Sequence, residues 1–269
     1  MDLFFCSLSS GSSGNCYFLG TSEGGVLVDA GISAKATRNF LKDLEIPTGK
    51  ISGILVTHGH HDHTKGLQVL TKRHHIPVFT SEKVWKSILK SPMQQEISID
   101  CFRYIIPFEP FTLNGLTIEA FTISHDTPET LGYYIRCGSR NITIVTDLGY
   151  ICDTAASYIK KADFLVIESN YDENMLLNGK YPSYLKKRVN GKKGHLCNNI
   201  TARFLADNMN PRLSHVCLAH LSKNNNTPEL ALQAIHEAFQ QKGINLNGEP
   251  NVVVLQRHCL SEKISINSF

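Results

Sequence analysis

The chain has 269 residues, of which 42% are hydrophobic, and a formal net charge of +3. This length and apolar content are enough for one large buried core, so we expect a single domain over residues 1–269. A net charge this small does not by itself indicate a nucleic-acid partner.

Cysteine usage and the terminal segments bear on the compartment. The eight cysteines include no CxxC pair, and several lie in apolar strand-like runs, so we expect buried, reduced thiols in a cytoplasmic protein. The only apolar run near the amino terminus, Leu3–Cys6, is too short for a signal peptide, and no stretch approaches the ~20 apolar residues of a membrane span. We therefore expect neither export nor membrane insertion.

Short strands dominate the first part of the chain, with one amphipathic helix among them. The strands are expected at 3–8, 16–20, 25–29 and 51–57, and the helix at 35–44. Two β-hairpins follow, turning at 114–115 and 138–140. Helices at 153–161, 199–209 and 228–242 then alternate with strands at 164–168, 215–220, 252–256 and 263–266. This order predicts an α/β fold, a four-layer αββα sandwich of two mixed β-sheets flanked by helices.

The run THGHHDH at 57–63 directly follows an apolar strand and contains four potential metal ligands. Residues two apart in an extended chain point the same way, so His58 and His60 can reach one ion together. Asp62 and His63 lie in the turn that enters the next helix, where they can reach a second ion. Imidazole and carboxylate suit zinc, manganese or iron, and two ions roughly 3.5–4 Å apart form a clamp for hydrolytic displacement. The alternative, an exposed His-rich loop, does not explain this order of residues.

Three more potential ligands, His125, Asp147 and His220, each follow an apolar strand-like run. Taken singly, such a residue more often caps a turn. Because strand ends gather at one edge of a sheet, the ordered set predicts the remaining ligands of a metal site.

These motifs together resemble one large family of hydrolases. The HxHxDH run at 58–63, Ser124-His125-Asp126, Thr146-Asp147 and Ala219-His220-Leu221 are similar to the metallo-β-lactamase-fold hydrolase superfamily over nearly the whole chain. The resemblance implies two divalent metal ions, zinc or manganese, with iron also allowed. It places the first ion on His58, His60 and His125 and the second on Asp62, His63 and His220. Asp147 is implied to bridge both ions.

Within the superfamily the chain is similar to the YycJ (WalJ) branch, whose members are regarded as 5′-to-3′ DNA exonucleases. The similarity rests on SSGSSGN at 9–15, VLVDAG at 26–31, IESN at 167–170, GHLCN at 194–198 and LAHLSKNN at 218–225. Two departures are Cys197, where the branch usually has Ser, and Tyr171-Asp172, where it has an acidic or His-bearing turn. The branch implies a dinuclear-metal phosphodiesterase that acts on DNA, with a metal-bridging hydroxide attacking phosphorus.

Two further residues receive catalytic roles on this reading. Asp62 would guide the proton of the nucleophile, and His195 would contact the phosphate or protonate the leaving oxygen. Glu168 would orient a metal-bound histidine from outside the ligand shell. A strand-end carboxylate that meets solvent is an equally simple account of Glu168.

Basic and small polar residues supply candidate substrate contacts. Lys186, Lys187, Arg188, Lys192 and Lys193 crowd one segment before His195, and Lys192 and Lys193 are the closest in sequence to it. Phosphates would gain from such a run, although a solvated helix face also explains it. The turn at 12–15 offers Ser13 and Asn15 to a phosphate, while a tight hairpin is the simpler account.

Other activities of the same ligand set stay open. A thioester hydrolase of the glyoxalase II type or a hydrolase of a cyclic phosphodiester would use the same residues. A β-CASP ribonuclease needs a large insertion between Asp147 and His220, which this chain lacks, and a non-catalytic member of the fold would have broken ligand positions. The sequence does not determine the oligomeric state.

Overall fold

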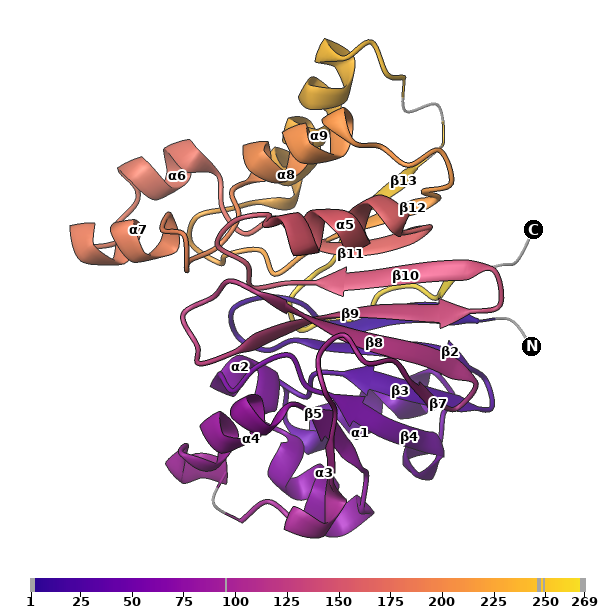
Figure 1. Ribbon diagram of the computed structural model, residues 1–269. Coiled ribbons are helices and arrows are strands. Elements are labelled where there is room, and N and C mark those ends of the chain that lie inside the picture. Colours follow the sequence, from indigo (N-terminus) through magenta and orange to yellow (C-terminus); the bar gives the residue numbers. More distant parts are fainter. Residues whose placement is uncertain (1–2, 95, 246–247, 249, 267–269) are drawn as a thin grey trace.

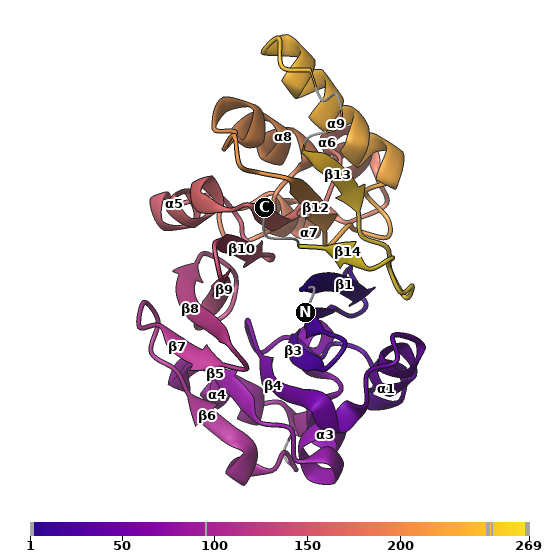
Figure 2. The same ribbon diagram turned by 90° about the vertical axis from the view of Figure 1, so that its right-hand side faces the viewer.

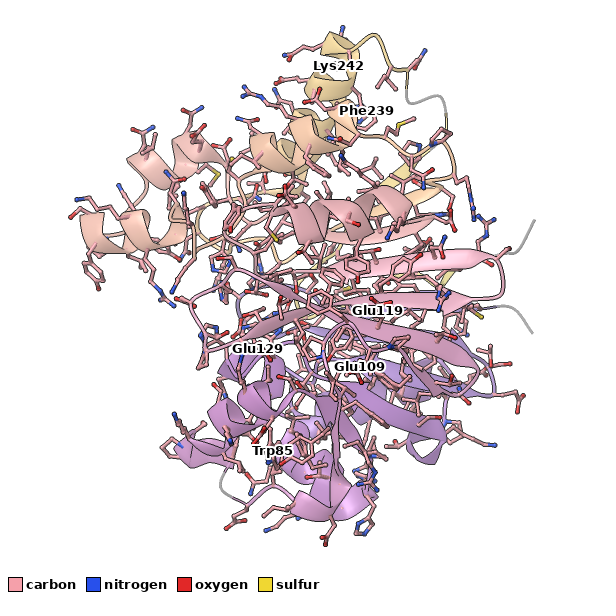
Figure 3. The ribbon with its side chains drawn as sticks, viewed as in Figure 1. Trp85, Glu109, Glu119, Glu129, Phe239 and Lys242 are labelled. Atoms are coloured by element: carbon pink, nitrogen blue, oxygen red, sulfur yellow. The ribbon has the colours of Figure 1, made fainter. Side chains whose placement is uncertain are left out.

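Two seven-stranded β-sheets face each other and carry helices on their outer sides (Figure 1). The computed structural model describes residues 3–94, 96–245, 248 and 250–266. The arrangement is the αββα sandwich that the sequence predicted. Figure 3 labels one buried aromatic side chain from each half, Trp85 and Phe239.

The first sheet has the strand order β14-β1-β2-β3-β4-β5-β6. Its strands are β1 (Phe4–Ser9), β2 (Cys16–Thr21), β3 (Gly24–Val28), β4 (Ile51–Leu55), β5 (Val78–Thr80), β6 (Phe102–Tyr104) and β14 (Ile264–Ser265). The helices of this half are α1 (Ala34–Asp43), α2 (His61–Thr64), α3 (Leu67–His74) and α4 (Glu82–Leu89), with 3₁₀ turns at 48–50, 92–94 and 99–101. Ser33 and Ser81 cap α1 and α4, because each hydroxyl accepts from a backbone N–H of the first turn.

The second sheet has the order β13-β12-β11-β10-β9-β8-β7. Its strands are β7 (Phe111–Leu113), β8 (Leu116–Ile123), β9 (Thr130–Cys137), β10 (Arg140–Val145), β11 (Phe164–Glu168), β12 (His215–Ala219) and β13 (Asn251–Val254). Helices α5 (Asp153–Lys161), α8 (Asn198–Asp207) and α9 (Pro228–Gln241) cover it, while α6 (Glu173–Asn178) and α7 (Ser183–Val189) project to one side (Figure 1).

The central strands of the second sheet are apolar on both faces because both faces are covered. In β11, Phe164 and Val166 belong to the core between the sheets, whereas Leu165 and Ile167 belong to the core under the helices. Strands β10, β11, β12 and β13 run parallel, and the ends of parallel strands leave the sheet at one edge. That edge carries the candidate site.

The chain ends by returning to its beginning. Strand β14 pairs antiparallel with β1, so the last described strand completes the first sheet (Figure 2). Among the described residues, every helix is too short or too polar to cross a lipid bilayer.

The predicted elements were found, but several others were missed. Both hairpins turn where expected, between β7 and β8 and between β9 and β10. The short strands β5 and β6 and the helices α4, α6 and α7 were not predicted. The expectation of buried cysteines is right for five of the eight free thiols and wrong for Cys259, which is exposed, and for Cys137 and Cys152, which are partly exposed.

Candidate metal centre

The histidines and aspartates that the sequence singled out lie together at one edge of the two sheets. Four groups of potential ligands each have their N and O atoms within 4.8 Å of one another. These groups are His58, His60 and His125; Asp62, His63 and His220; His58, His63 and Asp147; and Asp147, Glu168, His195 and His220. All seven predicted ligands are therefore brought together from separate parts of the chain.

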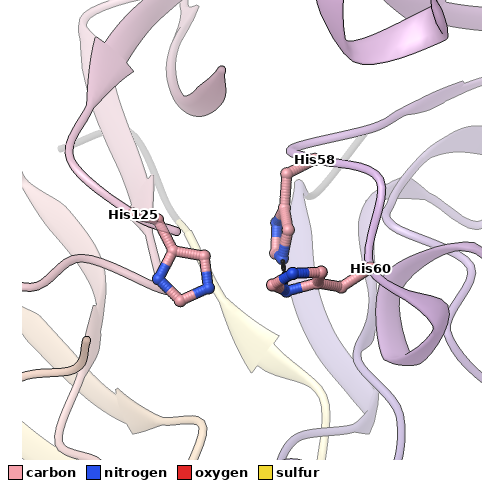
Figure 4. A group of neighbouring side chains, drawn as sticks. All are labelled: His58, His60 and His125. Carbon is pink, nitrogen blue, oxygen red and sulfur yellow. Dashed lines mark hydrogen bonds between the residues drawn. The ribbon is translucent and has the colours of Figure 1, made fainter. Parts of the chain in front are cut away.

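The first group forms where the loop after β4 meets the end of β8. Nε2 of His58 lies 3.1 Å from Nδ1 of His60, and the His125 ring faces them from the opposite side (Figure 4). Three imidazole rings from two sheets thus surround one small volume. Such a set of nitrogen donors suits zinc and other transition-metal ions.

The second group lies beside the first and shares Asp147 with it. Oδ2 of Asp62 is 3.7 Å from Nε2 of His63 and 3.6 Å from Nε2 of His220. Asp147 places Oδ2 3.2 Å from Nε2 of His63 and Oδ1 3.7 Å from Nε2 of His125. The Asp147 carboxylate therefore faces a histidine of each group.

The outward-facing nitrogens of three of these histidines are each held by an acceptor. Nδ1 of His63 lies 2.7 Å from Oδ2 of Asp29, and Nδ1 of His125 lies 3.0 Å from the carbonyl oxygen of Gly194. Nδ1 of His220 lies 2.8 Å from Oε1 of Glu168. These contacts fix the rings so that Nε2 points into the centre, as in histidines that bind metals.

Asp29 was not assigned a role by the sequence. It is fully buried and accepts from the backbone N–H of Thr57 at 2.8 Å as well as facing His63. The signal was available, because Asp29 follows the apolar strand Val26–Val28 just as Asp147 follows its own strand.

The backbone turns sharply at three of these positions. Asp29, Asp147 and His220 have φ values of 61°, 58° and 58°, in the left-handed region. Asp and His are among the residues that enter this region most readily. The turn at the end of β10 and of β12 redirects the side chain toward the rim, and such strain is commonly found at functional sites.

Glu168 connects two histidines and is not a solvent-facing carboxylate. It is fully buried, and its Oε1 lies 2.8 Å from Nδ1 of both His195 and His220. Its Oε2 accepts from the backbone N–H groups of Leu148 and Leu196, each at 3.1 Å. The solvent-facing alternative for Glu168 is therefore wrong, and His195 does lie beside the metal centre.

Asp126 is a second residue that the sequence did not assign. Its Oδ1 lies 3.2 Å from Nε2 of His125 and 3.5 Å from Nε2 of His60. Its Oδ2 accepts from Arg188 of α7, with 2.7 Å to Nε. The sequence shows Asp126 directly after His125. Its contact with Arg188 of α7 depends on the fold and cannot be read from the sequence.

The electrostatics of the centre keep its shared carboxylate ionised. Burial alone would raise the pKa of Asp147, but His220 and His63 outweigh it and hold that pKa well below its usual range. Burial opposes charge on His220, yet Asp147 and contacts with Asp62 and Glu168 raise the pKa of this imidazole to about 10. Burial and the neighbouring His63 lower the pKa of His58. Asp147 is thus ionised and stabilised by positive charge.

The remaining predicted residues divide into two sets. Asn15 is buried, with Nδ2 3.0 Å from Nε2 of His63, so it belongs to the centre. Ser13 is exposed, and its Oγ lies 2.8 Å from Nε2 of His258 rather than beside a ligand of the centre. Lys192 and Lys193 are exposed on the loop after α7, where the carbonyl of Lys192 accepts from Ser124 at 3.0 Å.

Comparison with known proteins agrees with this geometry. A family model described as a beta-lactamase superfamily domain matches residues 25–220. The metallo-β-lactamase fold protein YhfI from Bacillus subtilis superposes with a TM-score of 0.70 at 16% identity, covering 97% of this chain and 99% of that one. The chain belongs to the metallo-β-lactamase superfamily, a fold that implies divalent metal ions.

Curated relatives narrow the similarity to one branch. Exodeoxyribonuclease YycJ of Bacillus anthracis is 38% identical over 246 residues, which cover 91% of this chain and 92% of that protein. Exodeoxyribonuclease WalJ of Streptococcus pneumoniae strain D39 is 33% identical over 224 residues, 83% of each chain. The predicted resemblance to the superfamily and to its YycJ (WalJ) branch is confirmed.

Proposed function

We propose that the protein is a dinuclear-metal phosphodiesterase that removes nucleotides from the 5′ end of DNA. The observation that carries the proposal is the position of Asp147, which faces a histidine of each ligand group. The names of the relatives, at 38% and 33% identity over most of their length, support nucleic acid as the substrate. DNA as the substrate and the 5′-to-3′ direction rest on those names and on the branch resemblance.

The residues present fit two divalent ions. His220 Nε2 and Asp147 Oδ2 are buried, and no hydrogen bond within the described part of the chain satisfies either atom. Nε2 of His63 is near Asp147 Oδ2, but without hydrogen-bonding geometry. Buried polar atoms of this kind require a partner, and a cation between the groups would supply it. His58, His60 and His125 would hold one ion and Asp62, His63 and His220 the other, with Asp147 shared.

Bound divalent ions would activate water and neutralise charge on the phosphate. The chain's own residues would move the protons. The Asp62 carboxylate, at the solvent edge of the centre, accepts the proton of the water that attacks phosphorus. The bond between phosphorus and the leaving 3′ oxygen breaks as the new bond forms.

His195 would protonate that leaving 3′ oxygen. Burial lowers the pKa of His195, but the Glu168 carboxylate outweighs it and raises the pKa above its usual value. A side chain that is 20% exposed and hydrogen bonded through Nδ1 leaves Nε2 for the substrate. A ring held in this way by Glu168 is positioned to act as a general acid.

Residues around the centre would hold the substrate and the ligands. Asn15 would lie beside His63 at the edge of the centre, and Glu168 would orient His220 and His195. Ser13, Lys192 and Lys193 would contact phosphates of the strand.

A substrate panel tests the proposal. The purified protein is incubated with manganese or zinc and with end-labelled single-stranded and duplex DNA, RNA, a cyclic nucleotide, S-lactoylglutathione and a cephalosporin. We expect mononucleotide release from the 5′ end of DNA. If the protein hydrolyses only the thioester or only the cyclic nucleotide, the proposed nuclease function is refuted.

The role of His195 has its own test. His195→Ala should lower kcat on DNA by about 10²–10⁴-fold, the usual contribution of a general acid. Two metal ions should still be counted by elemental analysis. His236→Ala, which removes an exposed histidine of α9, is the matched control. It should leave kcat and the number of bound metal ions unchanged. Metal loss in His195→Ala would instead make this residue a ligand.

A further inference from the structure

A cleft lies between the projecting helices and the loop that begins at His220. We call the segment Glu173–Val189, which contains α6 and α7, the arm. A cavity of about 620 Å³ opens between the arm and residues 223–224, and Asn178, Lys180, Tyr181, Lys223 and Asn224 line it. The proposed mechanism uses none of these residues.

The arm cleft is basic. Lys180 and Lys223 are both exposed, and among the described residues neither ammonium group has an ion pair with a carboxylate. From residue 174 to residue 194 the chain has six lysine and arginine side chains, Lys180, Lys186, Lys187, Arg188, Lys192 and Lys193, and no aspartate or glutamate. A polyanion would therefore be attracted to this face of the arm.

The cleft also offers aromatic and amide groups. The hydroxyl of Tyr181 accepts from Nδ2 of Asn224 at 3.3 Å, which joins the two walls of the cleft. On the arm outside the cleft lining, Tyr184, the second residue of α7, is 72% exposed, and Leu177 of α6 is 60% exposed. Grooves that combine cations with aromatic rings are typical of proteins that bind single-stranded nucleic acids.

The cleft is held at a fixed position relative to the metal centre. Nδ2 of Asn170 donates to the carbonyl of His220 at 2.7 Å, and the N–H of Ser222 donates to the carbonyl of Asn170 at 2.8 Å. The N–H of Asp172, at the start of α6, donates to the carbonyl of Asn225 at 2.8 Å. The loop that begins with the candidate ligand His220 therefore reaches the cleft at Lys223, where it forms one of the two walls.

We propose that the arm cleft binds the nucleotides next to the scissile phosphate on a single DNA strand, an inference that rests on the proposed nuclease function. Phosphates would pair with Lys180 and Lys223 while a base lies against Tyr181. Figure 1 shows α6 and α7 on the side of the molecule where α2 and the β8–β9 connection lie, which are the elements around the metal centre. A strand bound in the cleft can therefore continue into the centre.

The test removes the two cleft charges together. Lys180→Gln/Lys223→Gln is compared with the wild type on a 5′-phosphorylated single-stranded oligonucleotide and on bis(p-nitrophenyl) phosphate, which has no flanking nucleotide. We expect KM for the oligonucleotide to rise about tenfold, with kcat unchanged. The slope of log KM against log salt concentration should fall by about 1.4, because each phosphate contact on a single strand contributes about 0.7 to this slope. Hydrolysis of bis(p-nitrophenyl) phosphate should not change.

Lys42→Gln/Lys50→Gln is the matched control, because it removes two exposed lysines beside the end of the first sheet where β4 begins. An oligonucleotide KM and salt slope equal to those of this control would overturn the inference. An equal loss on blunt duplex DNA would also overturn it, since the cleft would then not select a single strand. If the wild type hydrolyses no DNA, the proposed function fails, and fluorescence anisotropy of the labelled oligonucleotide with the same variants still decides whether the cleft binds it.

Discussion

Glu168 is the residue on which two histidines of the centre depend. One oxygen faces Nδ1 of His195 and of His220, and the other accepts two backbone N–H groups, so its position is fixed from four directions. The proposed ligand His220 and the proposed acid His195 therefore share a single carboxylate, and loss of its charge should affect both metal binding and proton transfer.

Replacing Glu168 by Gln tests this sharing. The amide keeps the shape of the side chain but removes the charge that orients both imidazoles, so we expect metal affinity at the second group to fall by about 10–100-fold, the usual effect of losing such a partner. At saturating metal, kcat on DNA should still be lowered, because the pKa of His195 is no longer raised by a carboxylate. Competition with a metal indicator and steady-state kinetics measure the two effects.

Asp163→Asn is the matched control for that variant. Asp163 is a buried carboxylate at the opposite end of β11, where Arg212 lies 2.9 Å away. Its replacement should lower the melting temperature and leave metal affinity unchanged. Equal metal affinity in Glu168→Gln and the wild type would contradict the orienting role.

Single residues of the centre were predictable to the extent that chain order fixes them. His58, His60 and the strand-end residues His125, Asp147 and His220 follow apolar runs, and strand ends meet at one edge whatever the details of packing. Asp29 was overlooked although it follows an apolar strand, which is the same signal. Asp126 was missed because its role comes from a contact with Arg188, which is distant in sequence. A pattern along the chain does not contain such tertiary contacts.

At the scale of elements, α7 joins the arm to the first ligand group. Arg188, near the end of α7, forms an ion pair with Asp126, whose other oxygen faces His60 and His125. The burial of Asp126 would raise its pKa, but Arg188 and His125 keep that pKa below its usual value. The arm is therefore connected to the centre by an ionised carboxylate.

Replacing Arg188 by Gln should loosen this connection. We expect metal affinity at the first group to fall by about tenfold. Loss of a residue that holds a metal ligand in place usually lowers metal affinity by about 10–100-fold, and the smaller effect is expected here because Arg188 is half exposed and acts only through Asp126. The second group should bind as before. Stepwise titration with a metal indicator resolves the two affinities, and Lys187→Gln, one residue earlier in α7, is the control with the same charge change. A fall in both affinities together would argue against a local effect of Arg188.

The missed elements explain why the arm was only partly predictable. Helix α7 has no buried residue, so it lacks the apolar periodicity by which helices are recognised, and its lysines fitted a solvated face equally well. Strands β5 and β6 have three residues each, too few for an alternating pattern. Longer elements with one buried face, such as α9 and α5, were predicted close to their observed bounds.

At the scale of the whole molecule, the metal centre joins the two sheets. His58 and His63 follow β4 of the first sheet, whereas Asp147 and His220 follow β10 and β12 of the second. A continuous core also lies between the sheets, including Leu27 from one and Ile144 from the other. We therefore propose that residues 1–269 act as one domain, although residues 1–2, 95, 246–247, 249 and 267–269 lie outside the described part.

Removal of the ions should destabilise that domain as a unit. At a free metal concentration 100 times Kd, binding adds about 2.7 kcal/mol to the free energy of unfolding. A chain of this length shifts its melting temperature by about 2–4 °C per kcal/mol, so chelation should lower it by roughly 5–10 °C. Differential scanning calorimetry should show one transition both with metal and with chelator, because the core between the sheets persists. The Asp147→Asn variant should lose most of the metal-dependent increase in melting temperature. Two separate transitions in the chelated protein would contradict a single domain.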